Sequence, residues 1–77
     1  MNKVRRKMLK DSLIDIDKII NNIESVKDGE EESLDALPDG LLNSSRATEM
    51  EENIDALEEI YNLLEEVSST MEEIITR

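Results

Sequence analysis

Residues 51–75 repeat in steps of seven. A pair of Glu residues opens each heptad, and apolar residues follow at alternating spacings of four and three. This spacing keeps one face of an α-helix toward a partner helix and turns the Glu pairs toward water. The apolar positions are Met50, Ile54, Leu57, Tyr61, Leu64, Met71 and Ile75, with Ser68 as an interruption. The pattern predicts a helix over about residues 45–76.

The first half of the chain shows the same spacing. Its apolar positions are Leu9, Leu13, Ile16, Ile20, Ile23, Leu34 and Leu37, while Lys27 and Glu30 occupy the two missing places. Because the phase continues across Asp28 and Gly29, we predict one helix over about residues 3–37, with Asn2 as its N-cap. Gly29 would cost that helix about 1 kcal/mol relative to Ala. A local bend or fraying over residues 27–32 is the alternative.

Pro38, Asp39 and Gly40 predict a reversal of the chain. Proline cannot continue a helix, the residue before it is disfavoured in the α region, and glycine accepts a positive φ. Leu41 and Leu42 follow directly, and we expect them to plug the open end of the helical pair.

The second helix has candidate caps at Ser44 and Ser45, and Thr48 with Glu51 has capping-box spacing slightly later. We expect the helix to start at about Ser45. Two helices of matched length and a short turn predict an all-α fold, a single antiparallel helical hairpin over residues 1–77. In that arrangement the basic residues 3–10 lie beside the last Glu pairs of the second helix.

A further set of apolar residues lies beside the repeating stripe: Ile60, Leu63, Val67 and Ile74 on the second helix, with Ile14 and Ile19 on the first. Leaving them in water forgoes about 25 cal/mol per Å². We therefore expect a second copy to cover them across a two-fold axis, forming a homodimeric four-helix bundle; a different protein is the alternative. The predicted core and dimer interface is Leu9, Leu13, Ile16, Ile20, Ile23, Leu34, Leu37, Leu41, Met50, Ile54, Leu57, Ile60, Tyr61, Leu64, Val67, Met71 and Ile75.

The composition excludes several common kinds of catalytic and metal site. The 77 residues include no Cys, no His and one aromatic residue, which excludes disulfides, thiolate nucleophiles, zinc sites of the usual ligands and His acid–base chemistry. We expect no cofactor, no metal and no enzymatic activity. No apolar run approaches the ~20 residues that span a bilayer, so we expect no membrane partner and a cytoplasmic location.

The net charge of −11 is unevenly distributed. The first ten residues contain five basic side chains and no acidic one, and the remainder should repel free nucleic acid. The basic segment is interpreted as a partner for the acidic helix end; an arm for nucleic acid or an anionic membrane is the alternative.

The Glu pairs recur every ~10.5 Å along a helix and form a dense negative ridge. Such a ridge is either the solvated face of a coiled coil or a surface that imitates a nucleic-acid backbone and occupies a basic groove of another protein. The candidate partner-binding residues are Glu51, Glu52, Glu58, Glu59, Glu65 and Glu66.

Two acidic stretches, residues 31–35 and 52–55, loosely resemble the E-E-x-x-E and E-x-x-D pattern of magnesium-dependent all-α nucleoside-triphosphate pyrophosphohydrolases. Asp35 replaces a Glu of that pattern, and no base-stacking aromatic or phosphate-gripping Lys stands nearby. This enzyme is a remote alternative.

The segments Leu37-Pro38-Asp39-Gly40-Leu41, Ser44 with Arg46, and Met50 to Glu59 resemble small, acidic helical proteins of Gram-positive bacteria, their phages and mobile elements, which share L-P-x-G-L, S-x-R and M-E-E-x-I-D-x-L-E-E. The resemblance covers about a third of the chain and implies a setting, a short accessory protein in a bacterial host, with no activity to transfer. Inhibitors of host defence are common in that setting. We expect an acidic protein-binding module that occludes a basic surface; a self-associating scaffold is the alternative.

Overall fold

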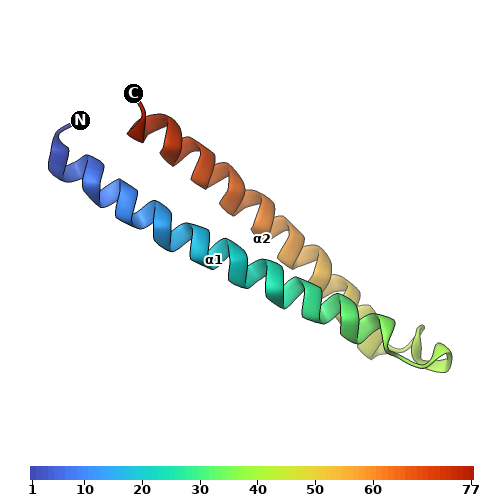
Figure 1. Ribbon diagram of the computed structural model, residues 1–77. Helices are drawn as coiled ribbons and strands as arrows, with labels where there is room; N and C mark the ends of the chain where they lie inside the picture. The colour runs from blue at the N-terminus through green and yellow to red at the C-terminus, as the bar shows by residue number, and fades with distance from the viewer.

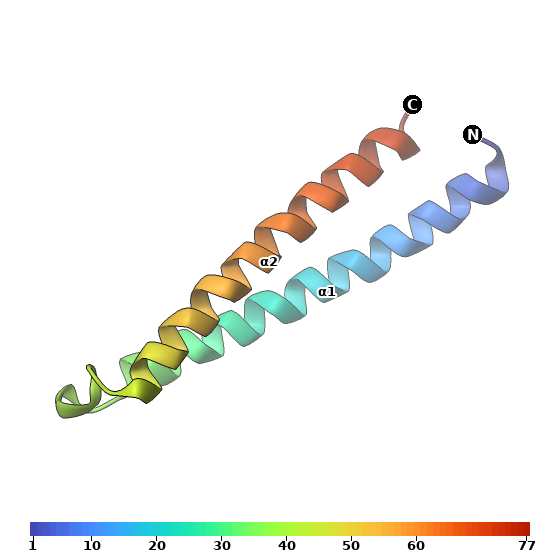
Figure 2. The ribbon, with the colours of Figure 1, turned by 180° about the vertical axis from the view of Figure 1, so that it is seen from behind.

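The computed structural model describes residues 1–77 and consists of two long antiparallel helices joined by a short turn (Figure 1). Helix α1 spans Lys3–Asp35, the 3-10 helix η1 spans Asp39–Leu41, and α2 spans Ser45–Ile75. The molecule is a rod of 59 × 14 × 14 Å with both termini at one end (Figures 1 and 2). The predicted all-α helical hairpin is confirmed.

Helix α1 begins at its predicted cap: the side chain of Asn2 accepts a hydrogen bond from the backbone N–H of Arg5 at 2.8 Å. The helix then runs without interruption through Gly29, as the unbroken heptad phase indicates. It ends at Asp35, with Ala36 as its C-cap, two residues before the expected end. Pro38 cannot continue a helix and disfavours the helical conformation in the residue before it, Leu37.

The turn differs from the prediction at two points. Gly40 does not take a positive φ, because the chain reverses through η1, in which every φ is negative. Leu41 and Leu42 do not seal the end of the helical pair either, since 46% and 45% of their surfaces stay exposed. The tight backbone of the turn, with Leu41 N–H bonded to Pro38 O at 2.8 Å, holds these side chains outward.

Helix α2 is capped by Ser44, whose hydroxyl oxygen accepts from the backbone N–H of Ala47 at 3.2 Å. The same hydroxyl donates to the carbonyl oxygen of Leu41 at 2.6 Å, which ties the cap to the turn. Thr48 lies inside the first helical turn, where its hydroxyl donates to Ser44 O, and so it does not cap the helix.

The two helices meet along a seam, which we define as the contact made by the repeating stripe of each helix. Only Ile20, Ala47, Met50 and Ser68 are buried there. The remaining stripe residues are half-buried, because two helices touch along one line and cannot enclose a core. These half-buried residues are Leu9, Leu13, Ile16, Ile23, Leu34, Leu37, Ile54, Leu57, Tyr61, Leu64, Met71 and Ile75.

Lys27 and Glu30 fill the two polar places in the stripe of α1 and are also half-buried. Lys27 covers the seam with its aliphatic stem and places its ammonium group 3.6 Å from the Glu31 carboxylate. Glu30 accepts a hydrogen bond from the side-chain amide of Asn53 at 3.3 Å. The polar residues therefore continue the seam without shifting its register.

The basic segment lies beside the end of α2, as predicted, but it forms no ion pair with the Glu residues there. The two ion pairs in the structure, Lys7 with Asp11 and Lys27 with Glu31, both lie within α1. Arg6 instead donates from Nη1 to the carbonyl oxygen of Ile75 at 2.6 Å. A cation at this position satisfies carbonyl groups that have no partner at the C-terminal end of α2 and complements the helix dipole.

Both helices are long, but neither has the unbroken apolar stretch that a membrane crossing needs.

Replacing Gly29→Ala should stabilise the hairpin by about 0.5–1 kcal/mol, because Ala restricts the unfolded chain and suits a helix interior. A Cβ atom at this position meets no atom within 4 Å. Urea unfolding followed by circular dichroism measures the change. A loss of stability would contradict a continuous α1.

Replacing Arg6→Gln should destabilise the hairpin by about 1 kcal/mol, since the last carbonyl groups of α2 lose their charged donor. The matched control is Arg5→Gln, which removes the same charge from an exposed side chain without a side-chain hydrogen bond. Equal unfolding midpoints for the two variants would show that the contact of Arg6 does not stabilise α2.

Candidate functional site

The two flanks of the seam form different long sides of the hairpin. Residues seven apart share a face of a helix, so Ile19 aligns with Val26 on α1 and Ile60 aligns with Val67 on α2. Val26 and Ile60 line the same shallow groove, which places both rows on one flank. We define this apolar side as Ile19, Val26, Ile60, Leu63 and Val67, which are 41–54% exposed.

The opposite flank is acidic. Glu24 of α1 and Glu65 of α2 both act on the phenol of Tyr61, and Asp17 of α1 accepts a hydrogen bond from the buried Ser68 of α2 at 3.3 Å. These acidic residues repeat at intervals of seven along each helix. We define the acidic side as Asp17, Glu24 and Glu31 of α1 with Glu51, Glu58, Glu65 and Glu72 of α2.

Tyr61 reports the electrostatics of the acidic side. A hydrogen bond with Glu65 raises the pKa of the phenol above its ordinary value of 10.0, and the negative charge of Glu65, desolvation and the charge of Glu24 raise it further. The phenol therefore stays neutral to a higher pH than a free tyrosine. Acidic residues from both helices, Glu24 of α1 and Glu65 of α2, therefore act on the same phenol group.

The six Glu residues of the predicted negative ridge point in two different directions from α2. Glu51, Glu58 and Glu65 belong to the acidic side, while Glu52, Glu59 and Glu66 lie about 100° further around α2. All six side chains are exposed.

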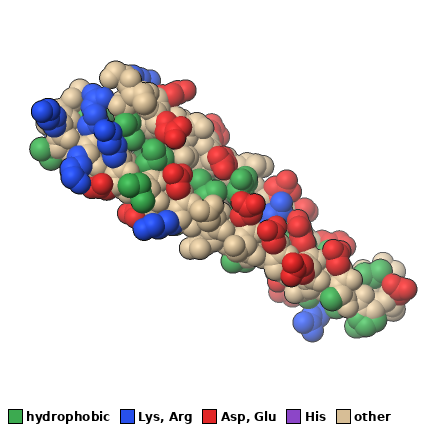
Figure 3. Space-filling view, viewed as in Figure 1, with side chains coloured by type: hydrophobic (Ala, Val, Ile, Leu, Met, Phe, Trp, Pro, Cys, Tyr) green, Lys and Arg blue, Asp and Glu red, His purple; other side chains and the backbone are tan.

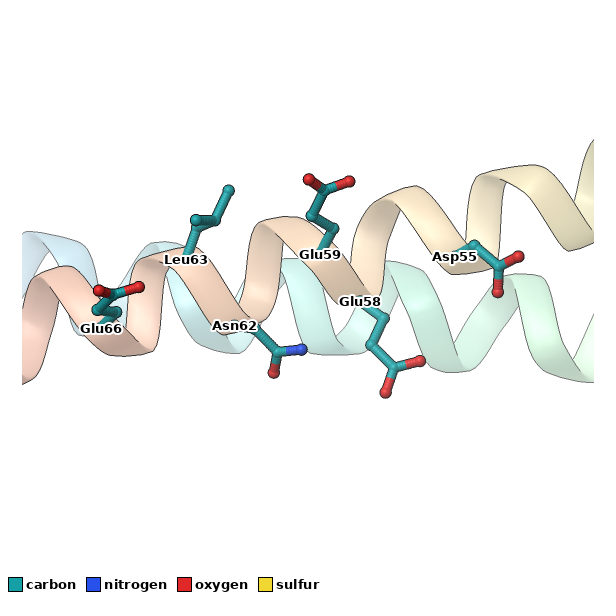
Figure 4. Close-up of a pocket in the computed structure, with 6 residues that line it drawn as sticks. All are labelled: Asp55, Glu58, Glu59, Asn62, Leu63 and Glu66. Atoms are coloured by element: carbon teal, nitrogen blue, oxygen red, sulfur yellow. The ribbon is translucent and has the colours of Figure 1, made fainter.

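Figure 4 shows the outer face of α2, where Asp55, Glu58, Glu59, Asn62, Leu63 and Glu66 line a shallow groove. Glu59 and Leu63 point to one edge of α2, whereas Glu58 and Asn62 point to the other. Side chains that diverge in this way offer separate electrostatic contacts to a large surface and do not converge on one small molecule.

The two acidic stretches that resemble a pyrophosphohydrolase pattern do not assemble a metal site. No three acidic side chains of the hairpin gather closely enough to hold a metal ion. Residues 31–35 end α1 and residues 52–55 lie in the third turn of α2, where successive side chains of a helix diverge.

Sequence reasoning missed the acidic row of α1. Asp17, Glu24 and Glu31 stand seven residues apart, and this regular interval was the signal that could have identified them. Val26 of the apolar side was also missed, although it stands seven residues after Ile19. Ile14 was grouped with Ile19, but the two are five residues apart, about 140° around α1, so Ile14 lies on the other flank.

Ser68 and Thr70 interrupt the apolar pattern of α2 for different reasons. Ser68 is buried in the seam, where its hydroxyl donates to Asp17 and satisfies the buried polar group. Thr70 is exposed, and its hydroxyl donates to the carbonyl oxygen of Glu66 at 3.0 Å within α2.

Charge also varies along the length of the rod. Residues 21–63, which form the half with the turn, contain thirteen acidic and two basic side chains. Residues 1–20 and 64–77, which form the half with the termini, contain seven of each. Figure 3 shows Lys and Arg side chains gathered at the end that holds the start of α1, and Asp and Glu side chains spread toward the turn.

Comparison of the chain with protein-family models, curated proteins and solved structures finds no match. The evidence for function therefore comes from the two sides of the hairpin.

The pKa of Tyr61 should fall toward its ordinary value in Glu65→Gln, because the charge that disfavours the phenolate is removed. Ultraviolet absorbance measures this titration without interference, since the chain has one Tyr and no Trp. Because the folded pKa is raised, the interaction favours the folded state at neutral pH and is lost as pH rises through that pKa. Glu66→Gln is the control and should leave the titration unchanged; equal shifts in both variants would contradict the local cause.

Proposed function

We propose that the chain is a non-enzymatic protein-binding module, which lays its acidic side on a basic, nucleic-acid-binding surface of another protein and so blocks it. One observation carries the proposal: two parallel rows of carboxylates, one on each helix, flank the seam on the same side. Of these carboxylates only Glu31 forms an ion pair within the chain. The others are available to an outside cation.

The charge density of α2 supports this kind of partner. The helix has 31 residues, of which ten are acidic and one, Arg46, is basic. It therefore carries about one carboxylate per 4.6 Å of its axis, compared with about one phosphate per 3.4 Å along one DNA strand. A straight helix also holds its charges without ordering a flexible chain on binding, which favours affinity.

The resemblance to short accessory proteins of phages and mobile elements suggests where such a module would act. A phage or mobile element would use such a module inside a bacterial host to occupy the basic groove of a DNA- or RNA-binding protein. Occlusion of this kind needs no chemistry at the acidic side, only charge complementarity and fast association.

Affinity capture from a bacterial lysate at low salt, followed by competition with DNA for the captured protein, tests this function. Changing Glu51, Glu58, Glu65 and Glu72, the four exposed residues of α2 on the acidic side, to Gln should weaken binding at least about tenfold, and high salt should weaken the unmodified chain similarly. The control changes four exposed acidic residues outside the acidic side, Asp15, Glu32, Asp39 and Glu49, to the corresponding amides. An affinity that stays unchanged at high salt and in both sets of variants would contradict the proposal.

A scaffold role without an inhibitory target is the second candidate. It is favoured by the apolar side, where Ile60, Leu63 and Val67 are exposed beside the seam. A contact through these residues should survive both high salt and the Gln substitutions, because apolar burial does not depend on charge.

A further inference from the structure

The apolar side is centred close to the middle of the rod. The seam pairs residues near Asp17 with residues near Ser68, and residues near Glu30 with residues near Asn53. In this register Ile19 lies level with Val67, and Val26 lies level with Ile60. Leu63 therefore stands near the centre of the patch, with similar lengths of hairpin on either side.

The hairpin exposes more surface than its mass requires. Its accessible surface is 5794 Å². A compact monomer of the same mass would expose about 4,800 Å². The excess of about 1,000 Å² is close to the ~800 Å² that each partner buries in a standard protein–protein interface. One long side of this rod is therefore large enough for a stable dimer.

The distribution of charge selects the direction of a second copy. The half with the turn, residues 21–63, has a net charge of −11, and the half with the termini has no net charge. Two copies in parallel would bring both −11 halves together. Two copies in antiparallel orientation would instead place the turn half of each beside the basic start of α1 in the other.

We infer that a second copy of this chain covers the apolar side across a two-fold axis perpendicular to the rod. A patch buries itself in such a dimer only when the axis passes through it, and an axis near Leu63 also brings the two rods into full overlap. The result is a four-helix bundle of two antiparallel hairpins. The seam residues stay within each hairpin, and both acidic sides remain on the outside.

Sedimentation equilibrium of the full chain, from low micromolar to millimolar concentration, tests the assembly. We expect twice the chain mass of 8.8 kDa for the unmodified chain. Leu63→Glu should be monomeric and remain helical, because a Glu near the axis would face its own copy. Ile14→Glu is a matched control, since Ile14 is 55% exposed and Leu63 54%, but on opposite flanks; it should remain dimeric.

The orientation is tested with a spin label on the variant Asn43→Cys in the turn, which labels one site because the unmodified chain has no cysteine. In the antiparallel dimer the two labels should be separated by most of the 59 Å rod. Labels within about one rod width, 14 Å, would show a parallel dimer and overturn the charge argument. A monomeric unmodified chain, a trimer or larger assembly, or a dimer that survives Leu63→Glu would overturn the inference itself.

Discussion

The structure depends on the burial of one apolar stripe between α1 and α2. Two helices in contact share a line, so most seam residues are half-buried and only four of 77 residues are buried. No third element covers the remaining surface of either helix. The chain therefore keeps both flanks of the seam available, and the character of each flank follows from the residues that stand next to the stripe.

The heptad repeat makes these flanks different. On α2 an apolar residue stands before the first stripe position of most heptads, as at Ile60 and Val67, with Asn53 as the exception. A Glu follows the second stripe position of each heptad, as at Glu58 and Glu65. Helix α1 repeats this order with Ile19 and Val26 on one flank and Glu24 on the other. When two helices pack antiparallel, like flanks meet, so the hairpin becomes apolar on one side and acidic on the other.

The sequence was sufficient for the helices and the seam, because the spacing of residues maps directly onto the faces of a helix. Even Lys27 and Glu30 could be placed, since an interrupted stripe that resumes in phase implies a continuous helix. Ile14 was assigned to the wrong flank, although its spacing of five residues from Ile19 determines the flank. The φ of Gly40 and the hydrogen bond of Arg6 were not predicted. Each depends on how separate elements meet in three dimensions, and periodicity within one helix carries no information about that.

The ring of Tyr61 can report whether the two flanks of the seam are divided as described. As the one aromatic residue, Tyr61 gives unambiguous ring signals in a proton NOE spectrum. We expect cross-peaks from the ring to the side chain of Glu24 on α1, because Tyr61 lies in the seam next to the acidic side, where Glu24 acts on its phenol. Cross-peaks to Val26 instead, or to residues of α2 alone, would contradict it.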